Sequence, residues 1–271
     1  MPELPEVETT KRGIEKAIIG NEISGVWTSG KNLRYPISPK LAAVTGLSVV
    51  DVSRRAKYLL IALNDGSHLL YHLGMSGMMR LRDSGYKPEK HDHVIIRFSA
   101  APELVFHDPR RFGCVVKVDD EINQHPLIKR LGPEPFDEVF TPAYLKRLSK
   151  NKTTPVKTFI MNNDVVVGVG NIYASEALFQ AGIHPHRKAG NISLKRFGKL
   201  HEAVIGVLTD AINAGGTTLK DFHQSDGKPG YFQQKLMVYG RHEQKCFNCN
   251  SLIKKVITGQ RSTFYCPHCQ R

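Results

Sequence analysis

The first residues of the chain, MPELPEVETT, place a proline and two acids where they could take part in covalent chemistry. A small residue at position 2 generally lets the initiator methionine be removed, which would leave the backbone nitrogen of Pro2 as a free secondary amine. Because an α-amino group titrates at about 7.7–8.0, part of it would be unprotonated and nucleophilic near neutral pH. The same residues also suit the start of a helix, because proline fits the first turn and Glu3 and Glu6 favour its positive end. These ten residues alone leave both interpretations open.

A second group of reactive residues lies at the other end of the chain, where four of the five cysteines fall in the last 26 residues. Two Cys-x-x-Cys pairs separated by 16 residues have the spacing of a four-thiolate zinc site. Such a site has no open coordination position, so we expect one structural Zn²⁺ and no catalytic metal. The alternatives are unrelated thiols or two disulfides, and disulfides are not expected without a secretory signal. The predicted ligands are Cys246, Cys249, Cys266 and Cys269.

The charge of the chain indicates a polyanionic partner. It has 38 lysines and arginines against 25 acidic residues, a formal net charge of +13. Nucleic acid is the usual partner of such a basic excess. We find no apolar run of the roughly 20 residues that a membrane span needs, and the acidic N-terminus does not resemble a secretory signal. We therefore expect a cytoplasmic protein without membrane contact.

The elements that must position these residues change in type along the chain. A helix with Val7, Ile14, Ala17 and Ile18 on one face is followed by short runs rich in valine, isoleucine, leucine and tyrosine. Short strands with turn signals such as NDGS at 64–67 predict a β-sandwich or barrel rather than alternating β-α units. The expected strands are 22–29, 47–55, 57–63, 67–74, 93–99 and 104–108.

The second half of the chain is predicted to be helical. A linker at 131–138 leads to helices at 141–150, 155–163, 171–183 and 193–216, with Ser193 as a cap and Gly215 as a stop. A polar, glycine-rich segment follows at 215–232 and is expected to be a mobile loop. The last long helix carries an apolar stripe of Leu194, Phe197, Leu200, Val204, Val207, Leu208 and Ala211.

A glycine pair, Gly168 and Gly170, looks at first like a dinucleotide-binding turn. The third glycine of that motif would fall at Tyr173, and no β-α-β pattern surrounds it, so we reject this interpretation. What remains is a tight turn that leads into a helix N-terminus, a place that suits a phosphate group. Asn171 at this entrance is either an additional donor or simply the helix cap.

Six motifs, taken in order, resemble the bacterial formamidopyrimidine-DNA glycosylase family. They are PELPEVET, RRAKYL, HLGMSG, DPRRFG, GVGNIYASEALF and QRSTFYCPHCQ, and they are spread over nearly the whole chain. The resemblance implies a multidomain α+β protein: an N-terminal β-sandwich with flanking helices (1–132), a helix–two-turn–helix domain (133–238) and a zinc-finger β-hairpin (239–271). It also implies a monomeric base-excision repair enzyme that removes oxidised purines from damaged double-stranded DNA.

The resemblance assigns chemical roles to the N-terminal residues. Pro2 would attack C1′ of the damaged nucleotide and form an imine, Glu3 would act as acid and base, and Glu6 would lie near the flipped base. Lys57 would bind phosphate and assist catalysis; its own context does not exclude a surface lysine at a strand edge. The loop 217–231 would close over the flipped base.

The resemblance also implies a set of DNA contacts. His72, Asn171 and Arg261 would hold the phosphates around the lesion, with Arg261 also the proton donor for elimination, and a solvated arginine is the alternative for it. Met75, Arg110 and Phe112 would fill the gap left by the extruded base. Without the resemblance, core packing would be the better interpretation of Met75 and Phe112. His91 and Lys157 complete the predicted DNA-binding residues.

One departure from the family pattern, one cysteine without a motif and two competing functions remain. Asn250 stands where many family members have a glycine after the second cysteine, and asparagine tolerates the left-handed turn needed there. Cys114 belongs to no motif and is expected to be a small buried residue. An endonuclease VIII-like enzyme for oxidised pyrimidines is disfavoured by Leu4. A non-catalytic zinc DNA-binding protein would leave Pro2 and Glu3 unexplained.

Overall fold

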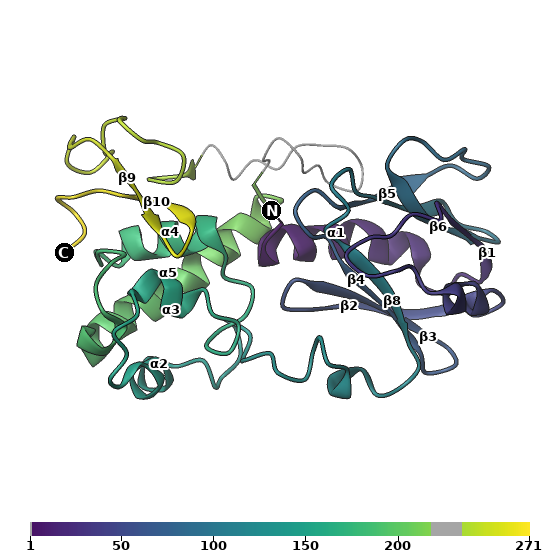
Figure 1. The fold of residues 1–271 in the computed structure, drawn as a ribbon, viewed down its shortest axis with the longest axis horizontal. Helices are drawn as coiled ribbons and strands as arrows, with labels where there is room; N and C mark the ends of the chain where they lie inside the picture. The colour runs from purple at the N-terminus through teal and green to yellow at the C-terminus, as the bar shows by residue number, and fades with distance from the viewer. Residues whose placement is uncertain (1, 218–234) are drawn as a thin grey trace. The chain divides into compact units, whose positions relative to one another are not determined.

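The computed structural model describes residues 2–217 and 235–271, which fall into two compact units. Unit 1 comprises Met1–Lys129 with Ala214–Gln233, and unit 2 comprises Arg130–Asn213 with Gln234–Arg271. Figure 1 shows the sheets in unit 1 and most of the helices in unit 2. The boundary at Arg130 falls beside the linker that the prolines and glycine of 131–138 predict.

Unit 1 is a β-sandwich of two four-stranded antiparallel sheets, as the sequence predicts. The first sheet has the order β1 (Ile23–Thr28), β6 (Asp92–Phe98), β7 (Glu103–His107) and β5 (Met78–Arg82). The second has the order β2 (Val49–Arg55), β3 (Tyr58–Leu63), β4 (His68–His72) and β8 (Cys114–Val118).

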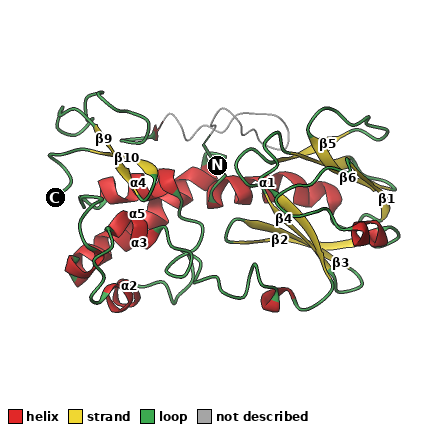
Figure 2. Ribbon diagram, in the orientation of Figure 1, coloured by secondary structure: helices red, strands yellow, loops and turns green. Residues whose placement is uncertain are grey.

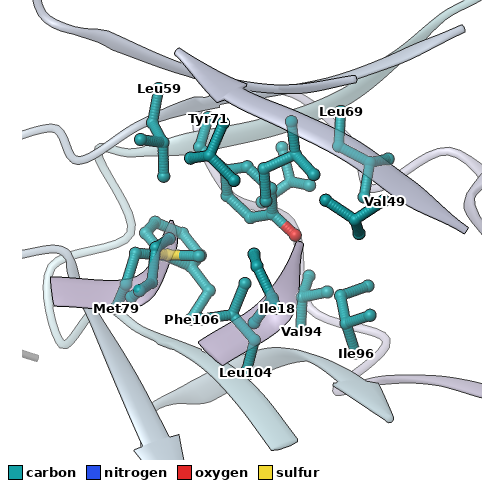
Figure 3. Packing of buried hydrophobic residues seen from close by; sticks show 14 of the residues in the cluster. Ile18, Val49, Leu59, Leu69, Tyr71, Met79, Val94, Ile96, Leu104 and Phe106 are labelled. Carbon is teal, nitrogen blue, oxygen red and sulfur yellow. The ribbon is translucent and has the colours of Figure 1, made fainter. Parts of the chain in front are cut away.

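The core of unit 1 lies between the two sheets. Alternate residues of each strand point inward, so that Val94 and Leu104 of one sheet meet Leu59 and Leu69 of the other (Figure 3). Tyr71 of β4 crosses this interface and packs edge-on against Phe106 of β7, with 5.7 Å between ring centroids.

Two helical segments close the sides of the sandwich. Helix α1 (Leu4–Ile18) packs against β2 and β5, which are edge strands of the two sheets. The 3₁₀ helix η1 (Pro39–Val44) packs against the opposite edge strands, β1 and β8. Val7, Ile14 and Ile18 are fully buried, which confirms the apolar face predicted for the first helix. Pro2 and Glu3 directly precede α1, so they lie on the side of the sandwich that this helix closes.

Two strands are absent from the sequence-based prediction. β5 has the sequence MMRLR, which contains no β-branched residue, and β8 has only five residues, CVVKV. Both are held by distant partners, since Met78 pairs with His107 and Cys114 with His72. The strand structure of β5 therefore depends on pairing across the sheet more than on local propensity, whereas the valines of β8 favour a strand by themselves.

Unit 2 is built mainly from helices (Figure 2): α2 (Pro142–Ser149), α3 (Val156–Ile160), α4 (Asn171–Gln180) and α5 (Leu194–Asn213). Ser193 caps α5 by accepting the N–H of Arg196 at 3.3 Å, as predicted. Six of the seven residues of the α5 stripe are buried, but Leu194 is 54% exposed. Leu194 is the first residue of the helix. Short 3₁₀ turns lie at Ile122–Gln124 (η2) and Ala189–Asn191 (η3).

Candidate functional site

The N-terminal residues are buried at the start of α1. Glu3 is 1% exposed and Glu6 is 2% exposed, and Pro2 is also buried. The Oε2 atom of Glu6 accepts the backbone N–H of Glu3 at 2.8 Å, one arm of a capping box between these residues. The structure thus confirms that these residues begin a helix, which fixes Glu3 and the adjoining Pro2, while the nucleophilic role of Pro2 stays a prediction.

The second oxygen of Glu6 reaches a segment far along the chain. Its Oε1 atom accepts the backbone N–H of Thr217 at 2.9 Å, beside Gly216, whose φ is +81°. A side chain at Gly216 would bring a Cβ within 3.2 Å of Glu6 Oε1. Glu6 therefore ties the N-terminus to the beginning of the predicted loop 217–231. Apart from Thr217, that loop lies outside the described residues.

Lys57 lies in the two-residue turn between β2 and β3. Ala56, the first turn residue, has a φ of +55°, so this turn needs support from its surroundings. Arg54 provides it, because its side chain donates to Ala56 O and to the Glu8 carboxylate of α1, both at 3.0 Å. Burial raises the pKa of Glu8, but the hydrogen bonds from Arg12 and Arg54 outweigh it and leave this pKa below its ordinary value. Arg54 thus joins the Lys57 turn to the helix that carries Glu3.

His72 ends β4 beside the Lys57 turn, where it pairs with Tyr58. Its Nδ1 atom accepts the backbone N–H of Gly74 at 2.9 Å. A nitrogen that accepts a hydrogen bond carries no proton, so the ring is neutral and its Nε2 carries the hydrogen. Burial, with the nearby cations of Lys57 and Arg34, lowers the pKa of His72 to about 4. His72 is therefore a neutral hydrogen-bond donor at physiological pH.

The depressed pKa of His72 predicts a pH dependence of stability. Between the unfolded value near 6.5 and the folded value of about 4, the unfolded chain binds the extra proton, so the free energy of unfolding rises with pH. This contribution is lost as the pH falls through that window. In urea titrations the loss between about pH 7 and about pH 5 should be smaller in H72Q than in the wild type, by on the order of 1 kcal/mol. Equal losses in the two proteins would contradict the assignment.

The segment DPRRFG forms an exposed loop between β7 and β8. Arg110 and Arg111 are exposed, and Phe112 is 48% exposed. The Arg110 guanidinium lies over the Phe112 ring at 5.1 Å from its centroid. Core packing is therefore wrong for Phe112, while Met75, in the neighbouring loop, is half-buried. An exposed aromatic ring next to an arginine suits contact with nucleic-acid bases.

The loops of Met75 and Phe112 touch through their backbones. Gly74 has a φ of +64°, and a Cβ there would lie 2.4 Å from Gly113 N and from Phe112 C. Such distances exclude any side chain unless the backbone moves. This close approach fixes the positions of the two loops relative to each other, and with them the positions from which Met75 and Phe112 project.

Substituting Gly74 by alanine should therefore be costly. We expect G74A to lower the free energy of unfolding by about 3 kcal/mol, from the combined left-handed backbone and steric clash. The control is G66A in the β3–β4 turn, where φ is +85° but nothing lies within 4 Å of the added Cβ. The free energy of unfolding of G66A should fall only by the cost of a left-handed backbone at alanine, about 1 kcal/mol. Equal losses in chemical denaturation would refute the close approach.

In unit 2, Lys157 and Asn171 form a hydrogen-bonded centre with β10 (Arg261–Tyr265). Lys157 is 1% exposed, and its Nζ donates to Asn171 Oδ1 at 2.6 Å and to Thr263 Oγ1 at 2.8 Å. Asn171 Nδ2 donates to Ser262 O at 2.9 Å. The cap of α4 is Gly170, so the alternative of Asn171 as a helix cap is wrong. The DNA contact predicted for Lys157 stays a prediction, whereas its contacts within unit 2 position Asn171 and the strand of Arg261.

Arg261 is exposed at the tip of the terminal hairpin. β9 (Lys254–Thr258) and β10 pair antiparallel, with Arg261 opposite Thr258, which confirms the two strands predicted around Gly259. The turn residues Gly259 and Gln260 have φ of +53° and +61°, as a tight hairpin turn requires. His186 reinforces the tip through a hydrogen bond of 2.5 Å between its Nε2 and Thr258 Oγ1.

Glu176 of α4 is a positioning residue that sequence reasoning missed. Its carboxylate is 2% exposed and accepts the backbone N–H groups of Met237, Val238 and Tyr239 at 2.8–3.0 Å. Burial raises its pKa, an effect that these hydrogen bonds oppose. The available signal was an acid inside the otherwise apolar run NIYASEALF. Glu176 anchors the chain where it enters the cysteine segment.

The four terminal cysteines gather into one cluster, with all sulfur atoms within 4.8 Å of one another. Four thiolates around a zinc ion with bonds of about 2.3 Å would lie about 3.8 Å apart. The Sγ–Sγ distances of 4.0 Å for Cys246–Cys269 and 3.4 Å for Cys249–Cys266 fit that arrangement and exceed a disulfide bond. Asn250 has a φ of +61°, as expected for the turn after the second ligand. The cluster thus fits one structural Zn²⁺, whose role is to staple the hairpin of Arg261.

The chain thus combines a sandwich whose first helix begins directly behind a proline and a buried glutamate with a helical unit and a four-cysteine hairpin.

Comparison with known proteins gives the family. Models described as the formamidopyrimidine-DNA glycosylase N-terminal domain, its H2TH domain, and a zinc finger found in FPG and IleRS match residues 1–115, 131–223 and 243–271. The formamidopyrimidine-DNA glycosylases of Hahella chejuensis and Marinobacter nauticus are 52% and 53% identical to the chain, with full coverage of both sequences. The chain therefore belongs to the formamidopyrimidine-DNA glycosylase family, and it is a base-excision repair enzyme with one structural zinc ion.

Solved structures support the same assignment. The MutM (FPG) protein from Thermus thermophilus is 38% identical, with a TM-score of 0.89 over 99% of this chain and 98% of that one. A Lactococcus lactis formamidopyrimidine DNA glycosylase, bound to DNA containing an AP site, has a TM-score of 0.90 at 33% identity, with 99% of each chain covered.

Proposed function

We propose that this chain excises oxidised purines, chiefly 8-oxoguanine opposite cytosine and ring-opened formamidopyrimidines, from duplex DNA and then cuts the strand. The observation that carries the proposal is the burial of Pro2 and Glu3 at the start of α1, fixed through Glu6. The similar Lactococcus lactis enzyme is described as bound to AP-site DNA and to Fapy-dG DNA, which supports damaged DNA as the partner.

After removal of Met1, the Pro2 nitrogen would attack C1′ of the flipped nucleotide, and the bond between C1′ and the base nitrogen would break with its electrons leaving on the base. The N–H proton of the attacking amine would pass to the departing base, and Glu3 would protonate the ring oxygen, so that the sugar opens to an iminium ion. Loss of a C2′ proton would then expel the 3′ phosphate, and a second elimination would expel the 5′ phosphate. Arg261 would donate a proton in the elimination steps.

The remaining residues of unit 1 would hold and distort the DNA. Lys57 and the neutral Nε2–H of His72 would donate to phosphates next to the lesion, and His91 would contact the backbone nearby. Met75, Arg110 and Phe112 would occupy the gap left by the extruded base, which lowers the cost of base flipping. The exposure of Arg110 and Phe112 supports this role.

In unit 2, Asn171 and Arg261 would complete the set of phosphate contacts. Lys157 would act mainly by keeping Asn171 and β10 in place, since its ammonium group donates to both. We propose domain limits of 1–132, 133–238 and 239–271, and a protein that acts as a monomer in the bacterial cytoplasm, at the nucleoid. Among the described residues, no helix is long and apolar enough to cross a membrane.

A comparison of substrates tests the proposal. Duplexes containing 8-oxoguanine opposite cytosine should be cut with both eliminations, faster than duplexes containing thymine glycol. A preference for thymine glycol would favour the endonuclease VIII-like alternative. Binding without cutting of either duplex by protein with a free Pro2 would favour a DNA-binding protein. Salt dependence does not separate these cases, because phosphate contacts make all of them salt-sensitive.

A further inference from the structure

Three loops of unit 1 that carry predicted DNA contacts converge on one buried residue, Asp108. They are the loop that follows His72 at the end of β4 (72–77), the loop that His91 ends where β6 begins (91–93), and the loop 108–113; together they contain His72, Met75, His91, Arg110 and Phe112. We propose that Asp108 is the positioning residue that holds these three loops in the arrangement required to fill the gap in the DNA. The proposal rests on the proposed function, and it concerns a residue that would not itself touch DNA.

The carboxylate of Asp108 joins the two loops that would enter the duplex. Asp108 is fully buried; its Oδ1 accepts the hydroxyl of Ser76 at 2.6 Å, and its Oδ2 accepts the backbone N–H of Gly113 at 2.8 Å. The Ser76 oxygen in turn accepts the backbone N–H of Arg110 at 3.1 Å. Because Ser76 follows Met75 directly, one carboxylate fixes the backbone beside both Met75 and Phe112.

The backbone of Asp108 holds the third loop. Its N–H donates to His91 O at 2.9 Å, and its carbonyl accepts from His93 Nε2 at 3.0 Å. The same carbonyl accepts the N–H of Arg111 at 3.2 Å. All four polar atoms of Asp108 are therefore engaged, and through them it contacts each of the three loops.

Two of these loops have a strained backbone, so they need the hydrogen bonds of Asp108 to hold them in place. His91 and Arg111 have φ of +75° and +57°, a region that side chains other than glycine rarely adopt. A strained backbone persists only where its surroundings determine it strongly. A buried carboxylate supplies that determination, since hydrogen bonds to a charged group are stronger than neutral ones. Removing it would leave Ser76 and the Gly113 N–H without their acceptor.

The test compares D108A and D108N with a matched variant, E103A. Glu103 is the first residue of β7, the strand that Asp108 directly follows. It is 3% exposed and accepts the backbone N–H of Gly85 at 2.9 Å. It is thus a buried carboxylate that anchors Gly85, near the start of the connection 83–91 that His91 ends, and this hydrogen bond reaches neither 72–77 nor 108–113. Each protein, with Met1 removed so that Pro2 is the first residue, is assayed in single turnovers on a duplex with 8-oxoguanine opposite cytosine and on the same duplex with a preformed abasic site.

In D108A the rate of base excision should fall on the order of 100-fold, because Met75, Arg110 and Phe112 are no longer held in the positions needed to fill the gap in the DNA. Borohydride trapping at the abasic site should fall far less, by about threefold, since no base has to be unstacked there. D108N should lie between D108A and the wild type, because its amide oxygen can still accept the Gly113 N–H. E103A should excise at nearly the wild-type rate. Equal losses on both substrates, or equal losses in D108A and E103A, would overturn the proposal.

A second readout needs no DNA and separates this proposal from the proposed function. The methyl carbon signal of Met75, assigned with M75L, should shift and broaden in D108A and stay unchanged in E103A. An unchanged Met75 signal in D108A would refute the positioning role even if the wild type is active. A wild type that cuts neither duplex would refute the proposed function, while the methyl signal still decides whether Asp108 organises the loops.

Discussion

A chain that retains Met1, or that carries any residue ahead of Pro2, is expected to bind damaged duplex DNA and leave it uncut. An acylated Pro2 nitrogen has neither the lone pair nor the basicity for attack on C1′, so the covalent path is closed. Strand cleavage of 8-oxoguanine duplexes should fall to on the order of one thousandth of the rate of the processed chain, or lower. Gel assays of cleavage, with the N-terminal mass of each preparation determined, measure this loss.

The matched control is the same extended protein treated with a protease that removes the extension and leaves Pro2 first. Cleavage should return while DNA affinity stays constant, since the phosphate contacts are unchanged. Cleavage by a protein whose Pro2 is demonstrably blocked would show that another group is the nucleophile. Glu3 and Glu6 remain at the helix start in both forms, so the comparison isolates the amine.

Loss of the zinc ion is expected to have the second largest effect. The terminal hairpin has only a small apolar core, in which Cys246 and Cys266 pack with Ile253 and Phe264. A structural zinc site contributes about 10–16 kcal/mol to the folding of such a module. In C249S the hairpin of Arg261 should therefore unfold, and affinity for duplex DNA should fall on the order of 100-fold. Fluorescence anisotropy and metal analysis measure the two quantities.

The control for this variant is C114S. Cys114 is buried in β8, outside the four-cysteine cluster, and burial raises the pKa of its thiol to about 11. C114S should keep one zinc ion per chain and its DNA affinity. If C249S bound DNA as tightly as C114S, the zinc hairpin would not contribute to the interface.

The sequence predicts the local elements of this protein better than its long-range contacts. The sandwich, the helices and the zinc hairpin follow from periodicity, turn residues and cysteine spacing, all of which act over a few residues. The strands β5 and β8 were missed although each is paired in the folded chain, with partners at least 21 residues away along the sequence, as for Arg82 and Glu103. Leu194 was placed on the buried stripe because helical period alone does not show where the covering helices end.

The candidate site divides in the same way. The four terminal cysteines are recognisable from their type and spacing, whereas the roles of Pro2 and Glu3 follow only from the resemblance, because their own stretch also suits a helix start. The buried carboxylates of Asp108 and Glu176 are not recognisable, because their role comes from backbone donors that only the folded chain brings to them. Lys157 shows the reverse case: a residue assigned to DNA by resemblance also has a full set of partners inside its own unit.

The central claim is that the Pro2 nitrogen becomes bonded to the damaged sugar. Borohydride trapping on a duplex with one 8-oxoguanine opposite cytosine tests it most directly, using protein whose N-terminus is shown to be proline. We predict a stable protein–DNA adduct whose peptide map places the sugar on Pro2. An adduct on a lysine such as Lys57, or base excision without any adduct, would contradict the mechanism.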